Sequence, residues 1–277
     1  MEATKISLDD YVLTGGGFNG ESYSSKLDPE VMLKLYLPGR ESQSVQELTK
    51  ARKVYALGIP TPEPGDYVVT EDGRYGILFR RILDKKSYSR ATADEPGKVA
   101  QFATEFAGMC LNLHAVHVNA AEFESVKDVY FHLLAENPFF TNSEKDKLYR
   151  FIADAPDSDT AIHGDLQFSN AIISGNERYF IDLGDFCYGY SLFDVGMVYL
   201  CCVLSEESFI MDTFHMSKAL AVRFWEHFAP AYFGTDRQLR DIEEEILPYA
   251  GLKNLLIERD LRSIKPELRV ALNPILK

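Results

Sequence analysis

The sequence has 277 residues, of which 46% are hydrophobic and 26% are charged, the composition of an ordinary folded globular protein. Its formal net charge of -13 and the lack of any arginine-lysine stripe argue against nucleic acid and anionic membranes as partners. The four cysteines form no CxxC pair and no zinc-type spacing, which indicates reduced thiols and no metal site built on cysteine. The first residues resemble no signal peptide, so we expect a soluble, cytoplasmic protein.

A glycine-rich stretch, TGGGFNGESY, occupies residues 14–23. It spells GxGxxG, a pattern that opens a dinucleotide-binding fold when a helix follows and covers ATP phosphates when a strand follows. Here a loosely alternating segment, the turn DPE and the compact apolar run VMLKLY (31–36) come next, and helical spacing begins only at residues 44–58. The order of these elements therefore argues against a Rossmann oxidoreductase.

The rest of the chain changes character near residue 83. DYVVT and RYGILFRRI predict two further strands at 66–70 and 74–82, whereas an apolar stripe in residues 97–117 predicts a long helix. The remaining sequence is helical in pattern, apart from a β-like island at 161–185. We therefore predict an N-terminal nucleotide-binding lobe over residues 1–82 and a helical C-terminal catalytic and acceptor-binding lobe over residues 83–277.

The β-like island carries a cluster of polar residues suited to phosphoryl transfer: His163, Asp165, Asn170 and Asp182. This reaction needs a carboxylate near the acceptor hydroxyl, oxygen ligands for Mg²⁺ and a cation on the nucleotide. Asp165 suits the first task, and Asn170 with Asp182 suits the second. We give His163 a structural, hydrogen-bonded role. The order HxDLxxxN, strand pair, DLG is that of the protein-kinase catalytic loop and metal motif.

Two N-terminal residues supply the cation and its partner. Lys34 lies in the strand that follows the glycines, where its ammonium group can reach nucleotide phosphates. Glu47 lies in the next predicted helix and could orient Lys34, although Glu41 lies near the same helix start. The sequence thus predicts an ATP site that depends on Mg²⁺.

These segments resemble the family of aminoglycoside phosphotransferases and choline kinases. That family carries HGDxxxxN followed by IDxxD, and this sequence has HGDLQFSN and IDLGD. LFDVG and LNLHAVH are also similar, so the resemblance spans residues 14 to about 198. It implies an α+β, two-lobed protein-kinase-like fold, with a small N-terminal antiparallel sheet plus one helix and a larger, mainly helical C-terminal lobe.

The resemblance also implies roles for individual residues. Asp165 would be the catalytic aspartate, Asn170 and Asp182 the Mg²⁺ ligands, and Asp194 a structural support of the catalytic loop. Asp185 belongs to the motif, either as a metal ligand or as a brace. ATP would lie against LFRRI, beneath a phosphate lid. The nucleotide-binding residues would then be Gly15, Gly16, Gly17, Asn19, Gly20, Ser22, Lys34 and Glu47.

The phosphate acceptor is predicted to be a small polar molecule and not a protein. Gly164 replaces the arginine of HRD, and the segment between Asp182 and Asp194 is too short for an activation segment. An aminoglycoside, an amino alcohol or a sugar would fit an acidic and aromatic lining. The alternative is a nucleotide-binding regulatory module without turnover. Candidates for the acceptor pocket are Tyr188, Tyr190, Glu206, Glu207, Trp225, Glu226, Glu258 and Asp260.

Overall fold

The computed structural model describes residues 2–16, 20–261 and 269–277. It divides into two compact units. The N-terminal unit comprises Met1–Lys86 and Ile172–Gly184, and the C-terminal unit comprises Ser87–Ala171 and Asp185–Lys277. Gly17 and Asn19 of the predicted phosphate lid lie outside the described residues.

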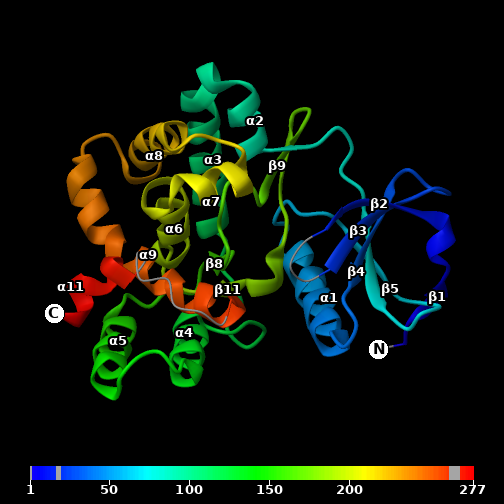
Figure 1. Cartoon of the computed structure of the whole chain (residues 1–277), viewed down its shortest axis with the longest axis horizontal. Coiled ribbons are helices and arrows are strands. Elements are labelled where there is room, and N and C mark those ends of the chain that lie inside the picture. Colours follow the sequence, from blue (N-terminus) through cyan, green and yellow to red (C-terminus); the bar gives the residue numbers. More distant parts are fainter. Residues whose placement is uncertain (1, 17–19, 262–268) are drawn as a thin grey trace. The chain divides into compact units, whose positions relative to one another are not determined.

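The N-terminal unit is built on a six-stranded sheet with the order β1-β5-β6-β4-β3-β2 (Figure 1). All its neighbouring strands are antiparallel except β1 and β5, which are parallel. The strands are β1 (Thr4–Ile6), β2 (Tyr11–Gly16), β3 (Gly20–Ser25), β4 (Val31–Tyr36), β5 (Pro64–Thr70) and β6 (Tyr75–Arg80), with the 3-10 turn η1 (Leu8–Asp10) and the helix α1 (Glu41–Ala56). The strands β9 (Ala171–Ser174) and β10 (Glu177–Phe180) pair with each other.

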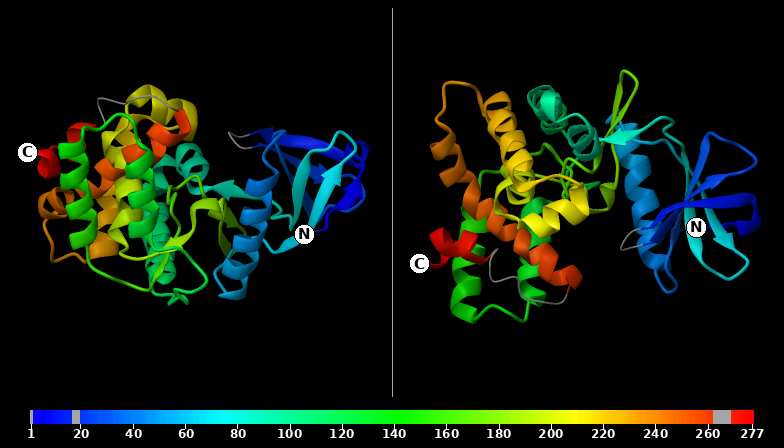
Figure 2. Two further views of the ribbon diagram at one scale, coloured as in Figure 1. Left: turned by 90° about the horizontal axis from the view of Figure 1, so that it is seen from below. Right: turned by 45° about the horizontal axis from the view of Figure 1, so that its top comes forward.

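The alternation of side chains along β4 assigns its residues to the two faces of the sheet. Leu33 and Leu35 are fully buried in one cluster with Val68 of β5. Tyr36 points the other way and packs with Leu48 of α1, the helix that lies along this face of the sheet in Figure 2. Because Lys34 shares the face of Tyr36, it points towards α1.

The C-terminal unit is mainly helical (Figure 1). Two short strands, β8 (Ala161–Ile162) and β11 (Cys187–Tyr188), pair antiparallel within it. Its other elements are α2 (Tyr88–Asp94), η2 (Pro96–Lys98), α3 (Val99–His114), α4 (Val126–Glu136), α5 (Asn142–Asp154), η3 (Leu183–Asp185), α6 (Leu192–Tyr199), η4 (Leu200–Leu204), α7 (Glu207–Phe214), α8 (Lys218–Phe233), α9 (Leu239–Leu261), η5 (Val270–Leu272) and α11 (Asn273–Leu276). The strand β7 (Lys86–Ser87) and η3 each lie where the chain passes from one unit to the other.

Aromatic packing anchors the HGDLQFSN segment in this core. Leu166 and Phe168 are fully buried, and the ring of Phe168 lies 4.5 Å from that of Phe214 and 5.2 Å from that of Phe224. Phe224 in turn lies 6.0 Å from Phe106 of the long helix α3. Because alternate residues of the segment are buried, the polar residues between them are held at fixed positions.

The helices α6 and α9 approach closely at Gly196. A methyl group at this position would lie 2.8 Å from backbone atoms of Tyr249 and Ala250. Such a distance is shorter than atomic contact allows, so only glycine permits this spacing of the two helices. The contact places the LFDVG segment of α6 against the middle of α9.

Several predicted boundaries differ from those observed. The first helix begins at Glu41, three residues before the predicted start. The apolar run 192–204 lies in the region predicted to be helical, but it is α-helical only as far as Tyr199, and residues 200–204 form a turn of π-helix. Such turns are rare and cannot be read from an apolar run alone. In the part of the chain that the structure describes, each helix is too short or too polar to cross a bilayer.

Replacing Gly196 by alanine should destabilise the protein by about 1–3 kcal/mol, because the added methyl group forces α6 and α9 apart. Gly108 of α3 is the matched control, since a methyl group there meets no atom within 4 Å. The variant Gly108→Ala should be neutral or stabilise by up to about 1 kcal/mol, as expected for a helical glycine. Urea unfolding of both variants measures the difference, and equal stability of the two would contradict the close helix contact.

Candidate functional site

Lys34 is held by two carboxylates within the N-terminal unit. Its Nζ atom lies 2.6 Å from Oε1 of Glu47 and 3.1 Å from Oδ1 of Asp182. Glu47 comes from α1 and Asp182 from the segment after β10, whereas Lys34 comes from β4. The sheet alternation that turns Lys34 towards α1 therefore creates this contact. The structure brings together three of the residues predicted from the sequence.

These contacts keep the Lys34 ammonium charged. Burial by itself would lower the pKa of Lys34, but the negative charges of Asp182 and Glu47 outweigh it and the pKa is raised. The Asp182 side chain is 52% exposed, so it can also reach a ligand. Asp182 has a φ of 61°, a left-handed conformation that residues other than glycine seldom adopt outside special sites. Such a backbone is found where the surrounding structure must point a side chain in one direction, as expected for the predicted metal ligand Asp182.

The described part of the glycine stretch lies on the paired strands β2 and β3. Gly15 pairs with Ser22, and Ser22 pairs on its other side with Lys34 of β4. Directly paired residues point to the same face of a sheet, so the Ser22 hydroxyl and the Lys34 ammonium share a face. Gly20 is needed for close strand approach, since a methyl group there would lie 2.2 Å from the Leu35 carbonyl oxygen. Gly15 and Gly16 have open space around them.

In the C-terminal unit, two side-chain amides hold the carboxylate of Asp165. Oδ2 of Asp165 accepts hydrogen bonds from Nδ2 of Asn170 and from Nε2 of Gln167, both at 2.9 Å. Nδ2 of Asn170 also donates to the backbone oxygen of Asp165 at 3.0 Å. The sequence predicted Asp165 and Asn170 but not the role of Gln167, which occupies an unspecified position of the HGDxxxxN pattern. The geometry fixes the direction of the carboxylate.

The backbone just before Asp165 is bound by the buried carboxylate of Asp194. Its Oδ2 accepts the N–H of His163 at 2.6 Å, and its Oδ1 accepts the N–H of Gly164 at 2.9 Å. Asp194 lies in the first turn of α6 and is fully buried. Asp194 thus binds the backbone of the loop that carries Asp165. His163 is itself fully buried.

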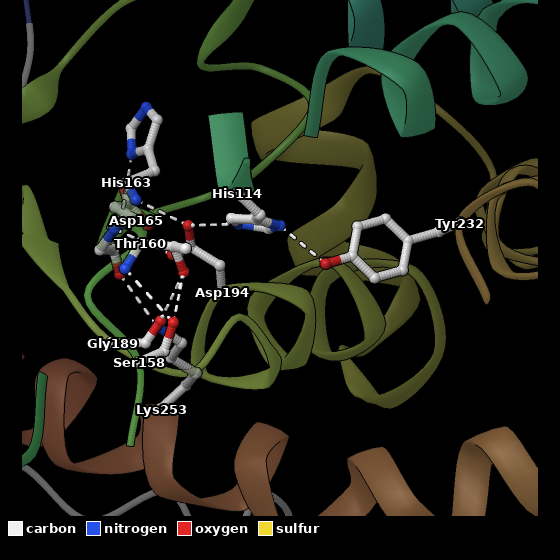
Figure 3. A network of polar contacts seen from close by, with 10 residues as sticks. His114, Ser158, Thr160, His163, Asp165, Gly189, Asp194, Tyr232 and Lys253 are labelled. Carbon is white, nitrogen blue, oxygen red and sulfur yellow. Dashed lines mark hydrogen bonds and ion pairs between the residues drawn. The ribbon is translucent and has the colours of Figure 1, made fainter. Parts of the chain in front are cut away.

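Further polar groups compensate the charge of Asp194 (Figure 3). Nε2 of His114, the last residue of α3, lies 3.1 Å from Oδ2 of Asp194, and Nδ1 of His114 lies 2.7 Å from the Tyr232 hydroxyl. Burial alone would raise the pKa of Asp194, but the hydrogen bond and charge of His114 and the charge of Lys253 lower it overall. Asp194 is therefore an ionised carboxylate inside the core. The sequence pattern LNLHAVH contained His114 but did not show this contact.

Gly164 and Asp185 lie in direct contact. Gly164 has a φ of 89°, and a methyl group on it would lie 2.1 Å from the backbone oxygen of Asp185. This is the physical reason why the residue between His163 and Asp165 is glycine. Oδ1 of Asp185 lies 3.5 Å from a guanidinium nitrogen of Arg259, on α9. This ion pair ties the second motif of the sequence to α9.

The predicted metal ligands have the oxygen chemistry that Mg²⁺ requires. Asn170 uses its Nδ2 for both of its hydrogen bonds described above, so Oδ1 remains as its potential ligand atom. In Asp182, Oδ1 contacts Lys34 while half of the side chain is exposed. Within the residues described, no three His, Cys, Asp or Glu side chains gather as a metal cluster. Mg²⁺ in nucleotide sites needs no such cluster, because phosphates and water complete its coordination.

Not all the candidate acceptor-pocket residues are available for binding. Trp225 is fully buried and donates its indole N–H to Glu243, and Glu258 is buried against Arg269. Both are structural residues. The side chain of Asp260 lies outside the described part. Glu206 and Glu207 begin α7, and Glu226 lies on α8.

Tyr188 and Tyr190 line a cavity of about 550 Å³. Its other lining residues are Gly189, residues 125–127 at the start of α4, and residues 156–159. The cavity is thus lined by none of the predicted catalytic or nucleotide-binding residues.

A family model described as the phosphotransferase enzyme family matches residues 13–232. The chain belongs to this family. A search of curated proteins finds no match. The matched residues contain the glycine stretch, Lys34, the HGDLQFSN loop and Asp194, so the family predicted from the sequence is confirmed.

Solved structures of small-molecule kinases share the fold of this phosphotransferase. An amicoumacin kinase in complex with AMP-PNP, Ca²⁺ and its ligand has a TM-score of 0.61 at 14% identity, with 99% of this chain and 88% of that chain covered. A thermostable mutant of aminoglycoside phosphotransferase APH(4)-Ia, with AMP-PNP and hygromycin B, has a TM-score of 0.65 at 13% identity, covering 95% and 93%. A choline/ethanolamine kinase family protein from Mesorhizobium loti has a TM-score of 0.55 at 15% identity, covering 96% and 85%.

These comparisons confirm the predicted fold class. The phosphotransferase is an α+β protein with a two-lobed protein-kinase-like fold, a small N-terminal sheet with one helix, and a mainly helical C-terminal region. The parallel strand β1 is an addition to the antiparallel sheet that was predicted. Its sequence, TKI, is too short to give a strand pattern.

Replacing Asp194 by asparagine should destabilise the phosphotransferase by about 3 kcal/mol at neutral pH. An amide in this position leaves one backbone N–H facing an NH₂ group and removes the charge that compensates Lys253. The pKa of Asp194 is lowered on folding, so the wild type should keep its full extra stability over Asp194→Asn above the unfolded-state pKa of about 3.9. This difference in unfolding free energy should shrink only as the pH falls below that value.

Denaturant unfolding of the wild type and Asp194→Asn between neutral pH and about pH 3 measures this dependence. Asp157→Asn is the control, because the Asp157 side chain is 95% exposed and its loss should change stability little. A difference between wild type and Asp194→Asn that grows on acidification would contradict an ionised, buried Asp194.

Proposed function

We propose that this phosphotransferase moves the γ-phosphate of ATP, bound with Mg²⁺, to a hydroxyl group of a small polar molecule. The observation that carries the proposal is the fixed carboxylate of Asp165. Amide groups of Asn170 and Gln167 hold it, and the buried Asp194 binds the backbone that precedes it. A carboxylate held in this way can orient an acceptor hydroxyl and receive its proton.

In this proposal each residue has a defined task. The oxygen of the acceptor hydroxyl forms a bond to the γ-phosphorus, the bond from phosphorus to the bridging oxygen of ADP breaks, and the hydroxyl proton passes to Asp165. Lys34, oriented by Glu47, binds nucleotide phosphates with its ammonium group. The peptide groups of the glycine stretch and Ser22 cover the phosphates.

Mg²⁺, when bound, would offset the negative charge that develops on the phosphate during transfer. Asn170 and Asp182 are the residues that would hold it. Asp182 already contacts Lys34 within the N-terminal unit, which fits a carboxylate that serves both the phosphate-binding lysine and the ion. Asp185, which contacts Gly164 and Arg259, serves as a brace in this proposal.

The acceptor is proposed to be a hydroxylated amine such as an aminoglycoside or an amino alcohol, or a sugar-like molecule. Two of the similar structures are named for antibiotic kinases and a third for choline and ethanolamine. The net charge of -13 would attract a cationic acceptor and disfavour an anionic one.

A coupled assay with Mg·ATP over aminoglycosides, choline, ethanolamine, nucleosides and sugars tests this proposal. Turnover should depend on Mg²⁺ and should appear with at least one hydroxylated acceptor. Tight ATP binding without phosphate transfer to any acceptor, and without slow ATP hydrolysis, would instead favour a regulatory module that binds nucleotide and does not catalyse.

The variant Asp165→Asn should lower kcat by roughly 10²- to 10⁴-fold, because an amide cannot receive the hydroxyl proton. Binding of Mg·ATP, measured by calorimetry, should change little. Asp146→Asn, at an exposed position of α5, is the control and should keep the wild-type rate. Wild-type turnover in Asp165→Asn would overturn the role given to Asp165.

A further inference from the structure

Lys253 is a lysine inside the protein core. It lies in the middle of α9, and its side chain is 1% exposed. Burial works against its positive charge, but nearby Tyr130 and Asp194 favour that charge, and the pKa of Lys253 is raised. A charged group is costly to bury, so its retention in the core calls for a specific partner.

The partner is the backbone of the HGDLQFSN loop. Nζ of Lys253 donates a hydrogen bond to the Gly164 carbonyl oxygen at 2.9 Å. This carbonyl belongs to the peptide group that joins Gly164 to Asp165. The N–H of the same peptide group points towards Nδ1 of His163 at 3.4 Å. Lys253 thus helps to fix the orientation of the peptide immediately before Asp165.

Two opposite charges bind Gly164 from its two sides. Asp194 accepts its N–H at 2.9 Å and Lys253 donates to its C=O at 2.9 Å. The left-handed backbone of Gly164 turns these two groups towards α6 and α9 respectively. In Figure 3 the Lys253 side chain extends from its helix towards this network. The negative charge of Asp194 and the positive charge of Lys253 are therefore both bound to the backbone of Gly164.

The position of Lys253 results from helix packing. The close approach at Gly196 holds α9 against α6. Along α9 the residues Ile242, Ile246, Tyr249, Lys253 and Leu256 recur at helical spacing, and residues 248–256 are all buried. Lys253 thus lies in the part of α9 that the core encloses on every side. It also lies outside residues 13–232, the part matched by the family model.

We propose that Lys253 is a positioning residue that sets the direction of Asp165 by holding the Gly164–Asp165 peptide. This inference rests on the proposed function of Asp165. Without the ammonium group the peptide can rotate, and the Asp165 carboxylate loses its alignment with the acceptor hydroxyl. Because misplaced groups mainly affect the transition state, kcat should fall while KM for ATP stays the same.

The test compares Lys253→Met, which keeps the apolar stem and removes the donor and charge, with Lys253→Arg, which keeps both. Lys147→Met is the matched control, because Nζ of Lys147 also donates to a backbone carbonyl, that of Leu276. We expect Lys253→Met to lower kcat roughly 10- to 100-fold with KM for ATP unchanged within about twofold, Lys253→Arg to lower it less, and Lys147→Met to match the wild type.

The amide NMR signals of His163, Gly164 and Asp165 in the ligand-free protein give a second readout that needs no turnover. Their shifts from the wild-type positions should be largest in Lys253→Met, smaller in Lys253→Arg and absent in Lys147→Met, which is the order expected for the loss of kcat. If Lys253→Met does not fold, Lys253→Arg carries both readouts. Wild-type kcat together with unmoved loop signals would overturn the proposal, and so would a raised KM for ATP at unchanged kcat. If the wild type has no transferase activity but the loop signals of the Lys253 variants still differ from those of the wild type, only the proposed function is refuted.

Discussion

The burial of one carboxylate, that of Asp194, is the constraint on which the C-terminal unit depends. An ionised group in a protein core loses its hydration, a cost of several kcal/mol that only hydrogen bonds and opposite charge can offset. Asp194 receives two backbone N–H groups, the Nε2 of His114 and the nearby charge of Lys253. These groups come from three different parts of the fold, namely α3, α9 and the loop around Asp165, so the need to satisfy one charge on α6 fixes these parts relative to one another.

The charged residues of the phosphotransferase divide by exposure in a way that matches their tasks. Asp194 and Lys253 are buried and bind only protein groups. Asp182, in the N-terminal unit, is half exposed although it contacts Lys34. A carboxylate that binds a metal ion needs an oxygen that the solvent can reach, whereas a buried carboxylate that holds a loop must find all its hydrogen-bond partners within the protein. Of these two carboxylates, the buried one, Asp194, supports the loop, and the exposed one, Asp182, is a proposed metal ligand.

Much of this arrangement follows from local sequence patterns, and the rest follows from helix packing. The alternation of VMLKLY predicted a strand, and the structure shows that it turns Lys34 towards Glu47. The HGDLQFSN and IDLGD motifs predicted Asp165, Asn170 and Asp182, whose catalytic roles stay predictions. Lys253 was not predicted, because a lysine in a helix is usually solvated. Its place in the spacing from Ile242 to Leu256 is the signal that could have revealed it, since the other residues at that spacing are apolar.

The proposed reaction moves the γ-phosphate of ATP to a small hydroxylated molecule. Its most direct test uses ATP with an isotope label on the γ-phosphate, incubated with the protein, Mg²⁺ and a pool of amino alcohols, aminoglycosides and sugars, followed by mass spectrometry of the pool. We expect one acceptor to gain a labelled phosphate ester, with loss of one proton from its hydroxyl. Label found only in unreacted ATP or in inorganic phosphate, with every acceptor unchanged, would contradict it.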